Sequence, residues 1–329
     1  ATAHAEAAWQ AAEEALGDDA QTATLAYNYS RLVLFNDAHR ARDALRRVNN
    51  LQEAGVSSLH AGELQLYSAY ADFVVGGQRR RDADRVSELL TAWDTNRDLG
   101  SDLIVMWLNL GQAYLAERQF RRAQDTAERT EAVILETMPD NVHFRAQAVM
   151  INGVARLVTR NRTVGRTQAA HNEFSRAMRF FPPQKDLDSF DPLLARILAW
   201  DGAAQAALRS LGHDEYPDHS EPDYQELPRH PLFVHEELAD CAEIEWAEKS
   251  APRFPSEELR RGTIGSVYVG FALGEDLRVR DVRVMAEVPA SNFGDAALKA
   301  LSGWRAEALP PGDPACHQNF VTRFTFAID

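Results

Sequence analysis

The chain has 329 residues, of which 45% are hydrophobic and 26% are charged, so it is long enough for two or three folding units with a sizeable core. These fractions lie close to the globular average and argue against wholesale disorder. The formal net charge of −14 argues against nucleic acid as a partner, because a phosphate backbone is bound by clustered positive charge.

The sequence predicts no membrane span. Even the apolar run Leu103–Leu110 ends at Gly111, well short of the roughly 18 to 20 residues that cross a bilayer. The chain begins with the small residues Ala1, Thr2 and Ala3, which are typical of a site where a signal peptide or anchor is removed. A trimmed sequence explains this start equally well.

Residues 1–212 are predicted to form an all-α domain. Ala, Leu, Arg and Glu recur there at helical spacing, and no segment shows a convincing strand pattern. Gly153 and Gly202 both lie in the middle of helical segments. We expect four to five helical hairpins that stack into a solenoid. Such a solenoid binds peptides on its concave face or serves as a spacer, and the sequence leaves both open.

The clearest helical segment surrounds Trp107. Trp107, Leu110 and Tyr114 fall on one face of a helix, and Gly111 lets a second helix approach. Ala123 then packs the partner helix. This spacing resembles the W-x2-L-G-x2-Y…A pattern of the tetratricopeptide repeat (TPR), so the N-terminal domain is expected to be a TPR-like scaffold.

Residues 213–249 are predicted to be a solvated linker, because this stretch is rich in Asp, Glu, Pro and His. Four of its histidines are candidate metal ligands in principle: His213, His219, His230 and His235. They show no fixed ligand spacing, so we predict no metal site and no cofactor.

Cys241 and Cys316 are the two cysteines of the chain. In an oxidising compartment they would be able to form a disulfide, whose closure would restrict the unfolded chain by roughly 4 kcal/mol. Two unrelated buried thiols are the alternative.

The C-terminal residues 250–329 change to strand patterns. Alternation between Gly265 and Leu273 places Val267, Val269 and Phe271 on one face, with Ser266, Tyr268 and Gly270 on the other. A second strand contains Val282 and Val284, ends at Pro289 and completes an antiparallel hairpin. Ser291 or Asn292 is expected to cap a helix that contains Phe293, Ala297 and Leu301, and a last strand is expected at Phe320–Ile328.

This ββαβ order resembles the C-terminal domain of TonB-type energy transducers. The residues that carry the resemblance run from about Ser250 to Asp329 and are Arg253-Phe254-Pro255, Gly262, Gly265, Val267-x-Val269-x-Phe271, Val279-x-x-Val282, Pro289, Phe293, Ala296-Ala297-Leu298-Lys299-Ala300-Leu301, Trp304-Arg305 and Phe324-x-Phe326. Leu277 stands where the family has a turn glycine. Because Leu resists positive φ, the sequence leaves open whether the hairpin is rearranged there.

The resemblance implies that an exposed strand edge pairs with a short extended peptide, the TonB box of an outer-membrane transporter. The candidate peptide-binding residues are Arg253, Phe254, Phe320, Arg323, Phe324 and Phe326. For each of the phenylalanines, a simple role in the hydrophobic core is the alternative.

No catalytic motif occurs in the sequence, so we predict a protein that is not an enzyme. The expected function is that of a periplasmic protein-binding protein of the Gram-negative envelope, soluble or formerly anchored at its N-terminus. Its expected partners are proteins or peptides, including TonB-dependent outer-membrane transporters. The alternative is a structural envelope adaptor whose C-terminal domain mediates assembly or homodimer formation and binds no transporter.

Overall fold

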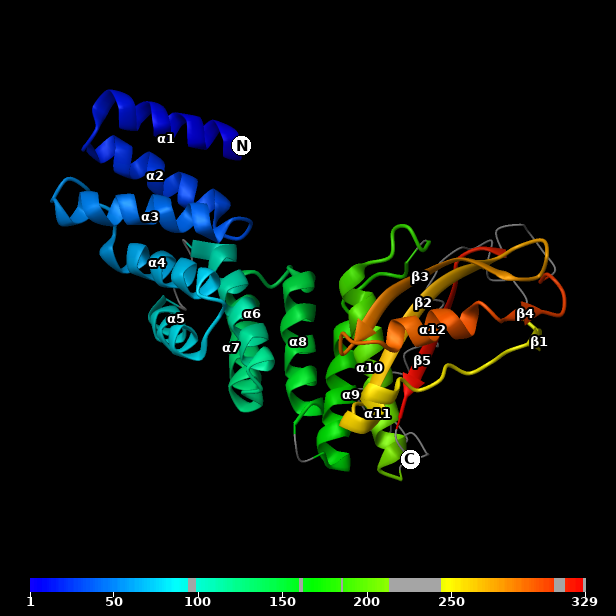
Figure 1. The fold of residues 1–329 in the computed structure, drawn as a ribbon. Coiled ribbons are helices and arrows are strands. Elements are labelled where there is room, and N and C mark those ends of the chain that lie inside the picture. Colours follow the sequence, from blue (N-terminus) through cyan, green and yellow to red (C-terminus); the bar gives the residue numbers. More distant parts are fainter. Residues whose placement is uncertain (94–98, 160–161, 185, 213–243, 311–316, 328–329) are drawn as a thin grey trace. The chain divides into compact units, whose positions relative to one another are not determined.

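A computed structural model describes residues 1–93, 99–159, 162–184, 186–212, 244–310 and 317–327. Contacts within these residues define two compact units, residues 1–139 and residues 140–329. Helices make up the first unit, and the second combines helices with antiparallel strands (Figure 1). The predicted α+β class, with an all-α N-terminal part and a small C-terminal antiparallel sheet, is confirmed.

In the first unit each helix packs against the helix that follows it in sequence. The helices are α1 (Thr2–Leu16), α2 (Ala20–Val33), α3 (Ala38–Glu53), α4 (Ala61–Val75), α5 (Arg80–Trp93), α6 (Gly100–Ala116) and α7 (Phe120–Thr137). Aspartates cap the N-termini of two of these helices. The side chain of Asp19 accepts a hydrogen bond from the Gln21 amide of α2, and that of Asp37 accepts one from the Arg40 amide of α3.

The residues of the predicted repeat are all buried. Trp107, Leu110, Gly111 and Tyr114 lie on α6, and Ala123 lies on α7, which packs against α6. The helical pairs are therefore consistent with TPR-like repeats.

The second unit begins with α8 (Val142–Leu157), α9 (Val164–Met178) and α10 (Pro192–Ser210). At Gly153 of α8, an added Cβ would lie 2.7 Å from the ring of Phe174 on α9, so the glycine permits close packing of this hairpin. Asp191 caps the N-terminus of α10. Its carboxylate accepts hydrogen bonds from the Leu193 and Leu194 amides of the first turn.

The C-terminal elements surround a three-stranded antiparallel sheet of order β3-β2-β5, in which β2 is central. The elements are β1 (Trp246–Glu248), α11 (Ser256–Arg261), β2 (Gly265–Leu273), β3 (Val279–Val288), α12 (Phe293–Leu301), β4 (Arg305–Ala306) and β5 (Phe320–Phe326). A separate two-stranded sheet pairs β1 with β4. The predicted strand-strand-helix-strand order is thus present.

Both faces of β2 are covered. Val267, Val269 and Phe271 point into the core beneath α12, as their alternation predicts. Ser266 and Tyr268 point to the opposite face and are also buried, because α10 packs against β2, β3 and β5 on that side. The sequence pattern predicted the alternation but not the second cover.

The compact units differ from the predicted domain ranges 1–212 and 250–329, because α8, α9 and α10 belong to the same unit as the sheet. The predicted domain boundaries themselves stay a prediction. Most of the predicted linker 213–249 lies outside the described residues, but its last residues form β1 and pair with β4.

The start of α12 differs from the prediction. The side chain of Asn292 makes no cap hydrogen bond. Instead, the Glu287 carboxylate at the end of β3 accepts hydrogen bonds from the Ser291 amide at 3.0 Å and from the Phe293 amide at 2.9 Å. Asn292 therefore occupies the N-cap position, as one of the two predicted alternatives, but the cap hydrogen bond comes from the acid at the end of the neighbouring strand.

Leu277 adopts the left-handed conformation that the turn requires, with φ of 65°. The Gly274 amide donates to the Arg278 carbonyl, and the Ala306 amide of β4 donates to the Leu277 carbonyl. The hairpin thus keeps its turn despite the missing glycine, at the cost of backbone strain in a branched residue.

Candidate functional site

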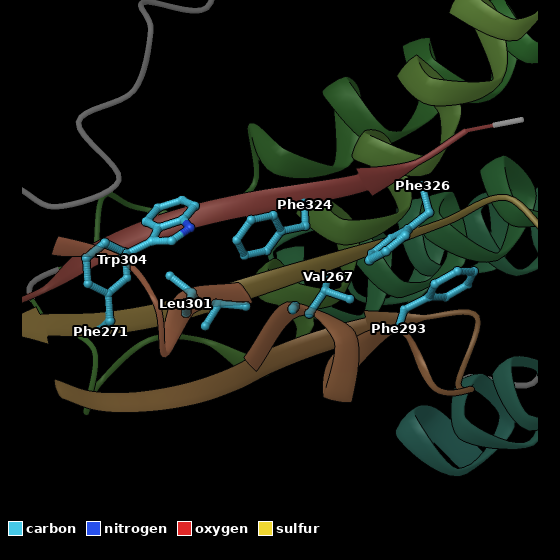
Figure 2. Packing of buried hydrophobic residues seen from close by; sticks show 9 residues of the cluster. Val267, Phe271, Phe293, Leu301, Trp304, Phe324 and Phe326 are labelled. Carbon is cyan, nitrogen blue, oxygen red and sulfur yellow. The ribbon is translucent and has the colours of Figure 1, made fainter. Parts of the chain in front are cut away.

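The hydrophobic core of the C-terminal sheet holds two of the predicted peptide-binding residues. Figure 2 shows Phe324 and Phe326 of β5 packed over β2 among Trp304, Phe293 and Leu301. The Phe293 and Phe326 ring centroids lie 4.5 Å apart, and those of Trp304 and Phe324 lie 5.5 Å apart. Phe324 and Phe326 are buried, so their side chains anchor the strand in the core.

The two outer strands of the sheet differ in regularity. Seven consecutive residue pairs join β5 to β2, from Gly265 with Phe326 to Phe271 with Phe320, without a register shift. The pairing of β3 with β2 shifts twice, and Asp281 within β3 has φ of 50°. Among the described residues, β5 forms a ladder with β2 alone, so its outer edge is a regular row of backbone groups.

Phe254 lies at one end of this edge. Its ring is 5.6 Å from Phe326 and 5.7 Å from Phe293, and it is half-buried. The neighbouring Arg253 is exposed. The fold therefore brings the segment 253–255, about 70 residues away in sequence, to the C-terminal end of β5.

Phe320 lies at the other end of β5. Its ring stacks on that of Phe271 with centroids 5.5 Å apart, and it is only partly buried. Of the predicted aromatic candidates, Phe254 and Phe320 thus keep exposed surface at opposite ends of the strand, whereas Phe324 and Phe326 do not.

Arg323, in the middle of β5, reaches α10 within the same unit. Its Nη1 donates to Oδ2 of Asp201 at 3.2 Å, and its Nη2 donates to Oε1 of Gln205 at 2.5 Å. Gln205 in turn donates to Oδ2 of Asp201 at 2.7 Å. The Arg323 side chain is therefore bound inside the chain, and its predicted role in direct peptide binding stays untested.

His171 of α9 completes this network. Its Nδ1 lies 2.6 Å from Oδ1 of Asp201, and both side chains are almost fully buried. Burial by itself lowers the pKa of His171, but the hydrogen bond to Asp201 and the charge of Asp201 outweigh this effect and raise the pKa above its usual value, even though Arg323 opposes it. Asp201 thus joins α9, α10 and β5 through one carboxylate.

Around this network, α10 packs closely against the sheet. A Cβ added at Gly202 would lie 2.5 Å from both Cδ of Arg323 and Oγ of Ser266, so a glycine lets the helix backbone reach the sheet. The ring of Phe190, just before α10, lies 5.8 Å from that of Tyr268. Burial raises the pKa of the Tyr268 hydroxyl.

The residues of this network were not among the predicted site residues. Asp201 and Gln205 are one helical turn apart on a helix whose other buried residues are almost all apolar. A helix that is apolar on all sides is buried on all sides, and polar residues in it require buried partners. That pattern was a usable signal, but the identity of the partner, Arg323, depends on the tertiary fold.

A second polar cluster lies in residues 1–139 and was also not predicted. Arg31 of α2 donates to Asp102 of α6 at 2.9 Å, and Tyr67 of α4 donates to the same carboxylate at 2.6 Å. Tyr27 of α2 donates to Glu63 of α4. Burial, followed by the hydrogen bonds to these carboxylates, raises the pKa of both tyrosines. The cluster ties α2, α4 and α6 together.

Several predictions concern residues that the structure does not describe. Cys241 and Cys316, as well as His213, His219, His230 and His235, lie outside the described residues. Within the described ranges, no three His, Cys, Asp or Glu side chains gather closely enough to hold a metal ion. None of the described helices combines the length and apolar character that a bilayer crossing requires.

Comparison with known proteins agrees with the arrangement of the C-terminal elements. A search of curated proteins found no match to the chain. Residues 250–328, however, match the family model described as Gram-negative bacterial TonB protein C-terminal, which is a non-enzymatic protein-interaction domain. The predicted resemblance is thereby confirmed, and the C-terminal part of this chain carries a TonB-type domain of the kind found in envelope proteins that take part in protein interactions.

Proposed function

We propose that this protein is a periplasmic binding protein whose TonB-like domain adds an extended peptide to the outer edge of β5. The peptide is the TonB box of an outer-membrane transporter, and the helices of residues 1–139 engage a different protein. The observation that carries the proposal is the regular, seven-residue edge of β5 within a domain that matches the TonB family.

The backbone geometry favours β5 over β3 as the acceptor. Strand addition requires a row of unpaired N–H and C=O groups at even spacing. The two register shifts of β3 interrupt such a row, and bulges of this kind protect an edge from unwanted pairing. β5 keeps its register over its whole length.

The side chains at the two ends of β5 would supply specificity. Phe254 and Phe320 offer partly exposed rings for apolar residues of the peptide, and Arg253 offers a charge beside Phe254. Phe324 and Phe326 contribute indirectly, because they fix the strand to the core. Main-chain hydrogen bonds to the peptide would supply most of the affinity.

The test is a titration of the intact, isotope-labelled chain with a transporter-derived TonB-box peptide, followed by amide resonances. Shifts and slowed hydrogen exchange in residues 320–326, with residues 279–288 unchanged, are expected. No change in β5 at millimolar peptide would reject the proposal. A concentration-dependent dimer that protects β5 without peptide would instead favour an adaptor that pairs with a second copy, and light scattering distinguishes this outcome.

A matched pair of variants tests the role of Arg253. Arg253→Gln removes the exposed charge next to Phe254, whereas Arg278→Gln removes another exposed charge at the hairpin turn, at the other end of the sheet. We expect weaker binding of an acidic TonB-box peptide for the first variant and unchanged binding for the second. Equal affinities would remove Arg253 from the site and leave strand addition in place.

A further inference from the structure

The charge network between α10 and β5 is an unusual feature for a strand that is proposed to receive a peptide. An edge strand has a neighbour on one side, so its position depends strongly on what its side chains contact. On the α12 side, Phe324 and Phe326 hold β5 in the core. On the other side, Arg323 at the centre of the strand is held by Asp201 and Gln205 of α10.

We infer that Asp201 is a positioning residue for the acceptor edge, and that the peptide-binding unit therefore comprises α9 and α10 as well as the TonB-like domain. The inference rests on the proposed function, because it concerns the same edge. Asp201 does not touch the peptide; it acts through Arg323, which it holds against α10.

The carboxylate geometry supports this role. Oδ1 of Asp201 is occupied by His171, and Oδ2 accepts hydrogen bonds from Arg323 and Gln205. With both oxygens engaged and the side chain nearly inaccessible to water, the carboxylate has a single orientation. The guanidinium of Arg323 binds to both Asp201 and Gln205, so its position along α10 is fixed as well.

Gly202 supplies an independent observation. Its backbone approaches Arg323 so closely that even a methyl group would overlap with Cδ of the arginine. The aliphatic part of Arg323 is thus packed against α10 while its head group is bound there. Since a pre-organised strand binds a peptide without first having to be ordered, this fixation would increase the affinity of the edge.

The opposite outer strand provides a natural control. Arg283 of β3 forms an ion pair with Asp188, which precedes α10, at 2.8 Å. This pair also connects the helical segment to the sheet, but its side chains are 46% and 86% exposed. Removal of its charge should affect neither strand measurably, because exposed pairs contribute little.

The experiment compares Asp201→Asn, Arg323→Met and Arg323→Lys with the control Asp188→Asn in the intact chain. Amide hydrogen exchange is measured without peptide in β5, in β3 and in α12. For Asp201→Asn and Arg323→Met we expect β5 to exchange about tenfold faster or more, with α12 unchanged. Arg323→Lys keeps the charge but not the forked geometry, so an intermediate rate is expected. The Asp188→Asn variant should behave as the wild type.

Peptide affinity is then measured with the same TonB-box peptide. A dissociation constant raised about tenfold in Asp201→Asn, with no further rise in the Asp201→Asn/Arg323→Met double variant, is expected for residues that act as one unit. Unchanged β5 exchange, or an equal acceleration of β5, β3 and α12, would overturn the inference, because the network would then be irrelevant or merely stabilise the whole domain.

The two proposals fail in different ways. If the wild type binds the peptide and Asp201→Asn binds it equally well, the positioning role is wrong and strand addition stands. If the wild type binds no peptide, the proposed function is wrong, and β5 exchange alone decides whether Asp201 holds the strand.

Discussion

Two of the aspartate–arginine pairs join helices or strands in different units, Asp102 with Arg31 in residues 1–139 and Asp201 with Arg323 in residues 140–329, and their surroundings differ. In residues 1–139, Asp102 and Arg31 have side chains that are 20% and 35% exposed. In residues 140–329, the Arg323 side chain is 28% exposed, but that of Asp201 is 4% exposed. Water can replace Arg31 at Asp102, whereas Asp201 and its partners depend on each other. We therefore expect loss of the carboxylate to cost more in residues 140–329 than in residues 1–139.

Removal of the two carboxylates is expected to give the largest difference between the units. Asp201→Ala should lower the free energy of local unfolding of α10 and β5 by about 3 kcal/mol, because Arg323 and Gln205 lose a buried partner. Asp102→Ala should cost the helices that it joins less, about 1–2 kcal/mol, because Arg31 remains partly hydrated and the Tyr67 hydroxyl alone loses a buried acceptor. Amide hydrogen exchange in the intact chain measures both values. Equal losses in the two units would contradict the importance of burial.

A methyl group at Gly202 tests the close contact of α10 with the sheet. Gly202→Ala should destabilise residues 140–329 by about 2 kcal/mol, because the new Cβ overlaps with Ser266 and Arg323. Gly165→Ala is the matched control on α9, where an added Cβ meets no atom within 4 Å, and should stabilise by about 0.5–1 kcal/mol. Urea unfolding of both variants provides the comparison. Opposite signs are expected, and a neutral Gly202→Ala would show that the helix and sheet are not in close contact.

The His171 contact predicts a pH dependence that is confined to the second unit. Because its pKa is raised in the folded state, its contribution to stability is complete below the unfolded value of about 6.5 and is lost as the pH rises through the higher folded value. His171→Gln should remove this slope. The measurement is amide hydrogen exchange of α10 as a function of pH. The charge of Asp201 raises the pKa of His171, and the charge of Arg323 lowers it. A slope that persists in the variant would assign it to another group.

The smallest expected effect concerns the hairpin turn. Leu277→Gly should stabilise the C-terminal domain by about 0.5 kcal/mol, because relief of the positive φ exceeds the added freedom of the unfolded chain. Thermal unfolding of residues 140–329 within the intact chain would register this gain. A loss instead would mean that side-chain contacts of Leu277 outweigh its backbone strain.

Local sequence patterns predicted much of the fold. The period of the apolar residues identified the helices of the N-terminal part, and strict alternation identified β2 with the correct face toward α12. Both predictions succeed because they depend on spacing along one element. The cap of α12 by Glu287 was not predicted, because that acid comes from a different element.

The role of the nominated site residues in peptide binding stays a prediction, but their positions in the fold are known. The segment 253–254 and the strand β5 were both nominated, and the fold brings Phe254 to Phe326. The sequence did not reveal that Arg323 is bound by α10, because nothing in the spacing of residues 201 and 323 indicates that they meet. Alternation along β2 also could not show that its polar face is covered.

By itself, the sequence determined the longer elements, their amphipathic faces and the TonB-like order of the last 80 or so residues, because these follow from local periodicity and short motifs. It did not indicate β1, α11 or β4, which are short. The tertiary structure alone decided that α10 lies against the sheet, that β5 keeps a regular outer edge and that one buried carboxylate joins the two. Contacts between distant segments depend on how surfaces fit together in space, and no single segment contains that information.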